Sequence, residues 1–211
     1  MKITKIEPYG SKNTFSKIFA DGEYLISLPE ELITRFALKV GVEVNEDSFK
    51  ELRRAALVRR ARERLLYSLD RRLHSEKELR EKLRGNYPPD VIDAAIAELD
   101  RLGLIDDKAF ALAFSEQRLK VKRKGKFAIV SELVLKGVDK QTAQNAVESV
   151  LEQNSGEFEF ALSAAQKYKN ELDTPKGKQR LYAALMRRGF SYNTVKKVMQ
   201  RLCDELLEFD D

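Results

Sequence analysis

The sequence contains few of the residues from which catalytic and metal sites are commonly built. It has one cysteine, Cys203, one histidine, His74, and no tryptophan among 211 residues. A single cysteine excludes a disulfide framework and a multi-cysteine metal site, and a single histidine argues against a histidine metal cage or a histidine-based catalytic relay. We therefore expect no catalytic residues, no cofactor and no bound metal, and we assign neither residue to a site.

Long apolar runs are also missing. No such run exceeds a few residues, so no segment is predicted to span a membrane, and the N-terminal residues lack the apolar stretch of a signal peptide. Hydrophobic residues make up 43% of the chain and charged residues 35%, against about 25% charged residues in an average protein. This composition predicts a cytoplasmic, helix-rich protein with long solvated faces.

The positive charge is concentrated in three acid-poor segments. Residues 51–64 hold six arginines and two glutamates, residues 118–126 six basic residues and no acid, and residues 176–203 eight basic residues and no acid. The net charge of +5 conceals this segregation. Any one segment is compatible with a solvated helix face, but three in one chain favour an anionic partner.

The N-terminal residues have the pattern of a small β-containing module. Residues 2–7, 13–19 and 23–28 alternate apolar and polar positions, and Asp21-Gly22 separates the last two as a hairpin turn. Pro29 opens a short helix, and residues 40–44 are compatible with one more short strand. We place this module at residues 1–46.

From about residue 47 the pattern is helical and contains an internal repeat of 51 to 52 residues, anchored on Tyr87, Val138 and Phe190. Apolar residues recur five, nine and twelve positions after each anchor, and an apolar pair with i, i+4 spacing precedes it. These residues are Leu79, Leu83, Ile92, Ile96 and Leu99 in the first repeat, Ile129, Leu133, Ala143, Val147 and Val150 in the second, and Leu181, Leu185, Val195, Met199 and Leu202 in the third.

A further helix precedes each apolar pair, at about residues 50–72, 107–121 and 157–171, so each repeat has three helices. The joint before each anchor holds Asn86, Gly137 or Gly189, which tolerate a left-handed helix end. The predicted fold is mainly α, with tandem three-helix repeats that form an elongated curved solenoid behind the β-containing module. We expect a monomer with repeats at 47–103, 104–154 and 155–211, the last with an acidic tail.

Residues 60–150 also carry motifs of a known family. They are GLIDDKAFA at 103–111, then Arg118, Gly125, Ile129, Glu132-Leu133 and Lys136-Gly137-Val138, with Ser75, Glu78-Leu79 and Lys82-Leu83 upstream. In order and spacing these motifs resemble the RecX family of recombinase regulators, and the third repeat is similar through its helical spacing. The resemblance implies a helical body that binds the RecA recombinase and its filament on single-stranded DNA. It implies restraint of filament growth, ATPase, strand exchange and coprotease activity, in homologous recombination, DNA repair and the SOS response.

Two equivalent tripeptides suggest a phosphate site. Lys124-Gly125-Lys126 and Lys176-Gly177-Lys178 lie 52 residues apart, each at the predicted start of a second helix. Lysines beside a helix N-terminus oppose the helix dipole, and a bound phosphate would relieve that repulsion. The alternative is that both glycines are simply permissive N-caps beside solvated lysines.

Other polar residues have structural explanations that compete with functional ones. Asp106-Asp107 caps the following helix, and Ser75 with Glu78 forms a capping box. Arg118 either pairs with Asp107 or a neighbouring carboxylate, or reaches a partner. The candidate residues for binding DNA phosphates, unpaired bases or the recombinase are Arg118, Lys122, Arg123, Lys124, Lys126, Lys176, Lys178, Tyr182, Arg187, Arg188, Tyr192, Lys196 and Lys197.

Three function classes follow. The leading hypothesis is a non-catalytic regulator of a recombinase–DNA filament. The alternative is a helical DNA-binding or architectural protein without recombinase regulation, and the third is a protein-only adaptor whose charges serve solubility.

Overall fold

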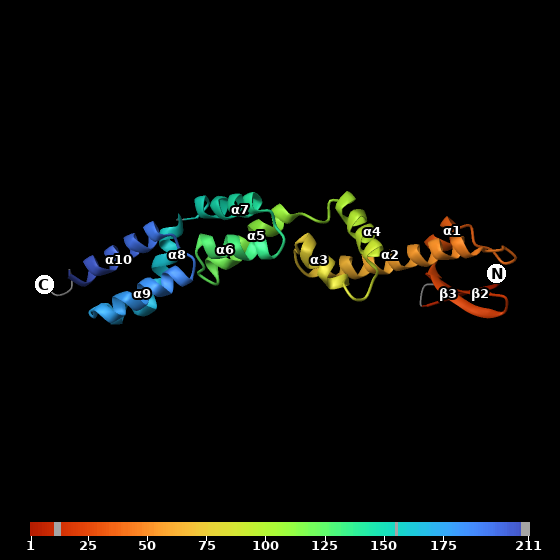
Figure 1. Cartoon of the computed structure of the whole chain (residues 1–211), viewed down its shortest axis with the longest axis horizontal. Helices are drawn as coiled ribbons and strands as arrows, with labels where there is room; N and C mark the ends of the chain where they lie inside the picture. The colour runs from red at the N-terminus through yellow and green to blue at the C-terminus, as the bar shows by residue number, and fades with distance from the viewer. Residues whose placement is uncertain (11–13, 155, 208–211) are drawn as a thin grey trace. The chain divides into compact units, whose positions relative to one another are not determined.

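The computed structural model describes residues 1–10, 14–154 and 156–207 (Figure 1). These residues divide into two compact units. One unit comprises Met1–Ser68 with Lys82–Leu102, and the other comprises Leu69–Glu81 with the residues from Gly103 onward. The expected strand residue Asn13 and the acidic tail beyond residue 207 lie outside the described residues.

The N-terminal module is a three-stranded antiparallel sheet in the order β1-β2-β3, as the alternation predicts. Its strands are β1 (Ile3–Tyr9), β2 (Phe15–Ala20) and β3 (Glu23–Pro29). Asp21 (φ 50°) and Gly22 (φ 91°) form the predicted tight turn. Residues 40–44 do not form the further strand: Gly41 has φ 91° and turns the chain, so that a single bridge joins Lys2 to Glu43.

The core of this module includes residues from the sheet and from two helices. Helix α1 (Glu30–Arg35) follows β3 directly, and the long helix α2 (Glu46–Arg71) contributes two residues of its first half. The buried cluster is Ile3, Ile18, Leu28, Leu32, Ile33, Leu38, Val44, Leu52 and Ala56. The start of α2 therefore packs as part of the module.

From α2 to the end of the described chain the structure is helical, and the three-helix order is confirmed. After α2 the first repeat has α3 (Glu76–Leu83) and α4 (Pro89–Arg101). The second has α5 (Asp107–Lys120), α6 (Lys126–Leu135) and α7 (Lys140–Glu152). The third has α8 (Gly156–Ala165), continued by the 3-10 helix η1 (Gln166–Glu171), then α9 (Pro175–Arg187) and α10 (Tyr192–Leu207). The expected elongated shape and the expected repeat boundaries stay predictions.

The predicted apolar spacing forms the cores of the second and third repeats. All six second-repeat positions belong to one buried cluster, which Phe110, Ala111, Leu119 and Ala146 complete. In the third repeat all positions are fully buried except Met199, which packs partly buried against that cluster. In the first repeat Ile96 and Leu99 are buried as expected, but Val91 is buried where the alignment places Ile92.

The left-handed joints confirm two of three expected positions. Gly137 has φ 91° and Gly189 has φ 83°. In the first repeat Gly85, with φ 80°, takes this conformation instead of Asn86, because glycine has no Cβ to clash in the left-handed region. Because this joint is one residue shorter, the alignment matches Asn86, and not Gly85, with the glycines of the other two joints.

Within the second unit, the start of one middle helix contacts the end of the next. The Gly125 N–H donates to the Arg188 carbonyl at 2.8 Å, and the Phe127 N–H donates to the Gly189 carbonyl at 3.0 Å. At the equivalent place one repeat earlier, the Ser75 hydroxyl donates to the Lys136 carbonyl at 2.7 Å. A Cβ on Gly125 would overlap the backbone of Gly189 and Phe190, so glycine is required there by close approach.

We predict that Gly125→Ala lowers the free energy of unfolding by about 3 kcal/mol, because backbone must move to admit the new methyl group. The matched control is Gly103→Ala, where φ is 66° and nothing lies within 4 Å. That change should cost only about 1 kcal/mol from left-handed strain. Thermal and urea unfolding of both variants measures the difference, and equal losses would contradict the close approach.

Candidate nucleic-acid and partner interface

The joints between repeats supply acceptors for helix N-termini from the chain itself. The Glu76 N–H donates to the Asp107 carboxylate at 2.9 Å, and the Lys126 N–H donates to the Glu157 carboxylate at 3.2 Å. The two donors lie 50 residues apart, and so do the two acceptors. Because free N–H groups and the dipole attract an anion at a helix start, these carboxylates occupy the place that a phosphate would take.

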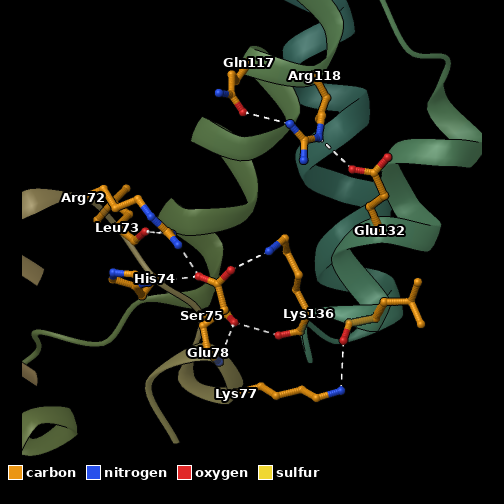
Figure 2. A network of polar contacts seen from close by, with 11 residues as sticks. Arg72, Leu73, His74, Ser75, Lys77, Glu78, Gln117, Arg118, Glu132 and Lys136 are labelled. Carbon is orange, nitrogen blue, oxygen red and sulfur yellow. Dashed lines mark hydrogen bonds and ion pairs between the residues drawn. The ribbon is translucent and has the colours of Figure 1, made fainter. Parts of the chain in front are cut away.

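Glu78 is the centre of a polar network at the first of these joints (Figure 2). Its carboxylate accepts hydrogen bonds from Arg72 at 2.9 Å and His74 at 3.0 Å, and it pairs with Lys136. Burial by itself raises the pKa of Glu78, but the bonds from Lys136, Arg72 and His74 outweigh it and hold the pKa at about 2. The Glu78 backbone N–H donates to the Ser75 hydroxyl, so one half of the expected capping box is present.

A second network explains two of the candidate binding residues. The Arg118 Nε donates to Glu132 at 2.7 Å, and Lys124 pairs with the same carboxylate (Figure 2 shows the Arg118 contact). The Arg118 guanidinium also lies 4.4 Å from the Phe114 ring centroid. Burial raises the Glu132 pKa, and the two cations lower it below its ordinary value. Arg118 is thus partnered as expected, by Glu132 and not by Asp107.

The expectation that both acids of Asp106-Asp107 cap the following helix is confirmed for Asp106 and wrong for Asp107, which accepts at the start of α3. The Asp106 carboxylate accepts the N–H groups of Lys108 and Ala109, each at 2.9 Å, and Asp107 accepts from Glu76. Burial, opposed by that hydrogen bond and assisted by the charges of Glu76 and Asp106, raises the Asp107 pKa.

The two Lys-Gly-Lys tripeptides differ in structure, which corrects their predicted equivalence. Gly125 is the N-cap of α6, whereas α9 begins earlier at Pro175 and is capped by Thr174, whose hydroxyl accepts the Gly177 N–H at 3.0 Å. Proline at the first helical position moves the helix start upstream. Gly177 instead permits close packing, because a Cβ there would overlap the Glu171 carbonyl.

The candidate cations divide by their partners. Arg118 and Lys124 share Glu132, and Arg188 donates to the carbonyls of Lys122 and Arg123 at 3.2 Å each. The charged groups of these three side chains are therefore engaged in contacts within the folded chain. Within the described residues no carboxylate lies within ion-pair distance of the others, which are Lys122, Arg123, Lys126, Lys176, Lys178, Arg187, Lys196 and Lys197.

One basic groove lies on the third repeat. It has a volume of about 460 Å³ and is lined by Tyr168, Lys176, Gln179, Arg180, Ala183 and Arg187. The α9 members follow helical spacing and so share one face. Arg180 is bonded to Glu171 at 2.7 Å, which leaves Lys176 and Arg187 as the groove cations for which no carboxylate partner is found among the described residues. The candidate rings Tyr182 and Tyr192 are exposed on α9 and α10.

Sequence reasoning missed Tyr168 and Arg180 as groove residues. Arg180 lies inside the acid-poor segment and so had a signal, but Tyr168 precedes that segment. Its place became visible only because η1 packs beside α9.

Neither a metal site nor a membrane span is found in the residues that the structure describes. No cluster of three or more His, Cys, Asp or Glu side chains there is arranged to hold a metal ion. In the same residues no helix is both long and apolar enough to cross a membrane.

Three three-helix units that follow a small sheet along the chain define a tandem helical-repeat protein. Sequence models of the first, second and third three-helix domains of RecX match residues 61–99, 106–147 and 158–199. The chain belongs to the RecX family.

Similar proteins cover nearly the whole chain. A "Regulatory protein RecX" of Clostridium botulinum strain Eklund 17B is 33% identical over 94% of this chain and 95% of its own. One from Clostridioides difficile strain 630 is 30% identical over 99% and 97%. A crystal structure of a regulatory protein RecX shares the fold, with a TM-score of 0.78 at 24% identity over 94% of this chain and 98% of that one. The structure of RecX from Lactobacillus salivarius has a TM-score of 0.63 at 26% identity over 70% and 97%.

The Glu78 network predicts a pH-dependent contribution to stability. Since the pKa is about 2 in the folded protein against an ordinary 4.5, the stabilisation is complete above about pH 4.5 and is lost as the pH falls towards 2. Glu78→Gln should therefore cost about 2 kcal/mol at pH 7, and this difference should have mostly closed by about pH 3.

The control is Glu81→Gln, an exposed glutamate on the same helix for which no ion pair is found among the described residues. Urea unfolding of both variants between pH 3 and pH 7 is the measurement. A Glu78→Gln deficit that does not change with pH would show that the carboxylate charge is not what stabilises this joint.

Proposed function

We propose that this protein is a non-catalytic regulator of the RecA recombinase. It binds the RecA filament on single-stranded DNA as a monomer and restrains filament growth, ATPase, strand exchange and coprotease activity. Family membership supports the regulatory role, and the motifs of the second repeat are the sequence link to a recombinase partner.

The observation that carries the DNA part of this proposal is the unpaired positive charge on the third repeat. Cations held by carboxylates are already neutralised, whereas Lys176, Lys178 and Arg187 have no such partner in the described part of the chain and are exposed. Cations of this kind gain affinity for nucleic acid by releasing the counterions condensed on phosphates. Tyr168 lies in the groove and Tyr182 is exposed on the same helix as these cations, and tyrosine rings stack on unpaired bases.

A second function is compatible with the same basic helices. A protein that binds DNA through α9 and α10, without touching the recombinase, would use the same cations and tyrosines. The two functions differ in whether recombinase activity changes, and this difference defines the test.

The test of the function is ATP hydrolysis by RecA on single-stranded DNA, with and without this protein. We expect inhibition at less than one protein per recombinase subunit, because a block at one place stops addition of further subunits. DNA binding without any effect on hydrolysis would instead support the architectural alternative.

The DNA surface predicts a change in salt dependence. Replacing Lys176, Lys178 and Arg187 by Gln should weaken binding to single-stranded DNA and flatten the log-affinity against log-salt slope by about 2, at roughly 0.7 for each phosphate that the variant no longer neutralises. Thermal stability should hold, since none of the three side chains has a carboxylate partner in the described structure.

The control replaces three cations of the first repeat, Lys82, Arg84 and Arg101, by Gln. These side chains are exposed too, so the net charge changes equally. Fluorescence anisotropy over a series of salt concentrations gives both slopes, and equal slopes would assign the effect to net charge and not to the third repeat.

A further inference from the structure

The outer face of the middle helix differs in chemistry between the three repeats. At equivalent positions α3 presents Lys77, Glu81 and Arg84, and α9 presents Gln179, Ala183 and Met186. Helix α6 presents Phe127, Ser131 and Val134, with Leu135 beside them. These four residues share one side of the helix by their spacing. We call them the α6 outer face.

This face is exposed in the folded protein. Phe127 is 59% exposed, Val134 43% and Leu135 73%. The opposite side of α6 holds Ile129 and Leu133, which are fully buried. Single exposed apolar residues need no explanation, but several on one helix side, where the first repeat has only charged residues, mark an interaction surface.

Lysines without a carboxylate partner among the described residues lie at both ends of the α6 outer face. At the N-terminal end the Lys126 ammonium lies 5.4 Å from the Phe127 ring centroid. At the C-terminal end the Lys77 ammonium donates to the Leu135 carbonyl at 2.9 Å. Within the described residues neither lysine pairs with a carboxylate. Glu132, the acidic residue of α6, already forms ion pairs with Arg118 and Lys124.

We propose that the α6 outer face is a docking site for a protein surface that is apolar in its centre and edged by carboxylates. The inference rests on the proposed function, and it assigns the occupant as a subunit of the recombinase. Apolar side chains would be buried in the contact while Lys77 and Lys126 meet acids at its edge.

The charges argue against other occupants. A second copy of this chain would bring lysines at the ends of one α6 outer face against lysines of the other, and like charges in contact are repulsive. Val134 and Leu135 would contribute little to binding nucleic acid, because they offer neither a charge for phosphate nor a ring for stacking. The second repeat therefore contacts protein, while the third contacts DNA.

The experiment replaces Phe127, Val134 and Leu135 by Gln and measures two affinities separately. Binding to recombinase without DNA should fall by about tenfold or more, as when the apolar centre of an interface is removed. Affinity for single-stranded DNA should stay within about twofold, since no phosphate contact is removed. Because the three side chains are exposed and Gln is a good helix former, the melting temperature should not fall.

The control replaces Leu66, Leu102 and Leu104 by Gln, which removes three exposed apolar side chains from other places and should leave recombinase affinity unchanged. A second variant, Lys77→Glu with Lys126→Glu, should also weaken recombinase binding, because the edges would then be alike in charge.

The outcomes separate the inference from the proposed function. Wild-type protein that does not bind recombinase overturns both. If the wild-type protein binds recombinase and the Gln variant binds it equally well, the α6 outer face is overturned as the docking site and the proposed function stands. The same holds if sedimentation shows that the wild-type protein is a dimer and that the Gln variant is a monomer. Loss of recombinase affinity with DNA affinity retained supports the division of surfaces.

Discussion

The packing of the second unit depends on one contact between successive repeats. The N-terminal turn of the middle helix in one repeat lies against the C-terminal turn of the middle helix in the next. A helix start leaves N–H groups without intrahelical partners. Here those of Glu76 and Lys126 find acceptors in Asp107 and Glu157, the equivalent residue of the following repeat. The second and third repeats therefore each supply a carboxylate acceptor for the middle-helix N-terminus of the repeat before them. Glycine at 125 allows the two backbones to approach closely enough for direct hydrogen bonds.

This constraint also decides which charges are available to a partner. Around the joints, Glu78 and Glu132 neutralise Lys136, Arg118 and Lys124, and Glu157 takes the anion position at the start of α6. Arg118, Lys124 and Lys136 of the second repeat are therefore committed to the fold, whereas Lys122, Arg123 and Lys126 have no carboxylate partner among the described residues. In the third repeat the helix start is capped by the neutral Thr174, so the lysines around it keep their charge for an external anion.

Repetition with variation gives the repeats their different surfaces. The buried positions of the repeats are nearly the same in kind, because each core must fill the same space between three helices. The outward positions carry no such requirement, so they are charged on α3, mainly apolar on α6 and uncharged on α9, where the cations of the basic groove flank them. A series of similar units can in this way present the two different surfaces that we propose for protein and for DNA without any change of fold.

The sequence by itself determined whatever is local or periodic: the hairpin turn at Asp21-Gly22, the cap at Asp106, the apolar spacing of the repeats, and the family motifs. Each depends on residues a few positions apart or on a fixed period, which a linear reading detects. Tertiary structure alone decided that Arg118 pairs with Glu132, that Glu157 takes the place expected for phosphate, and that Tyr168 joins the groove. Such partners lie opposite one another only after the helices have packed, because the identity of a distant neighbour depends on helix orientation, which no local pattern records.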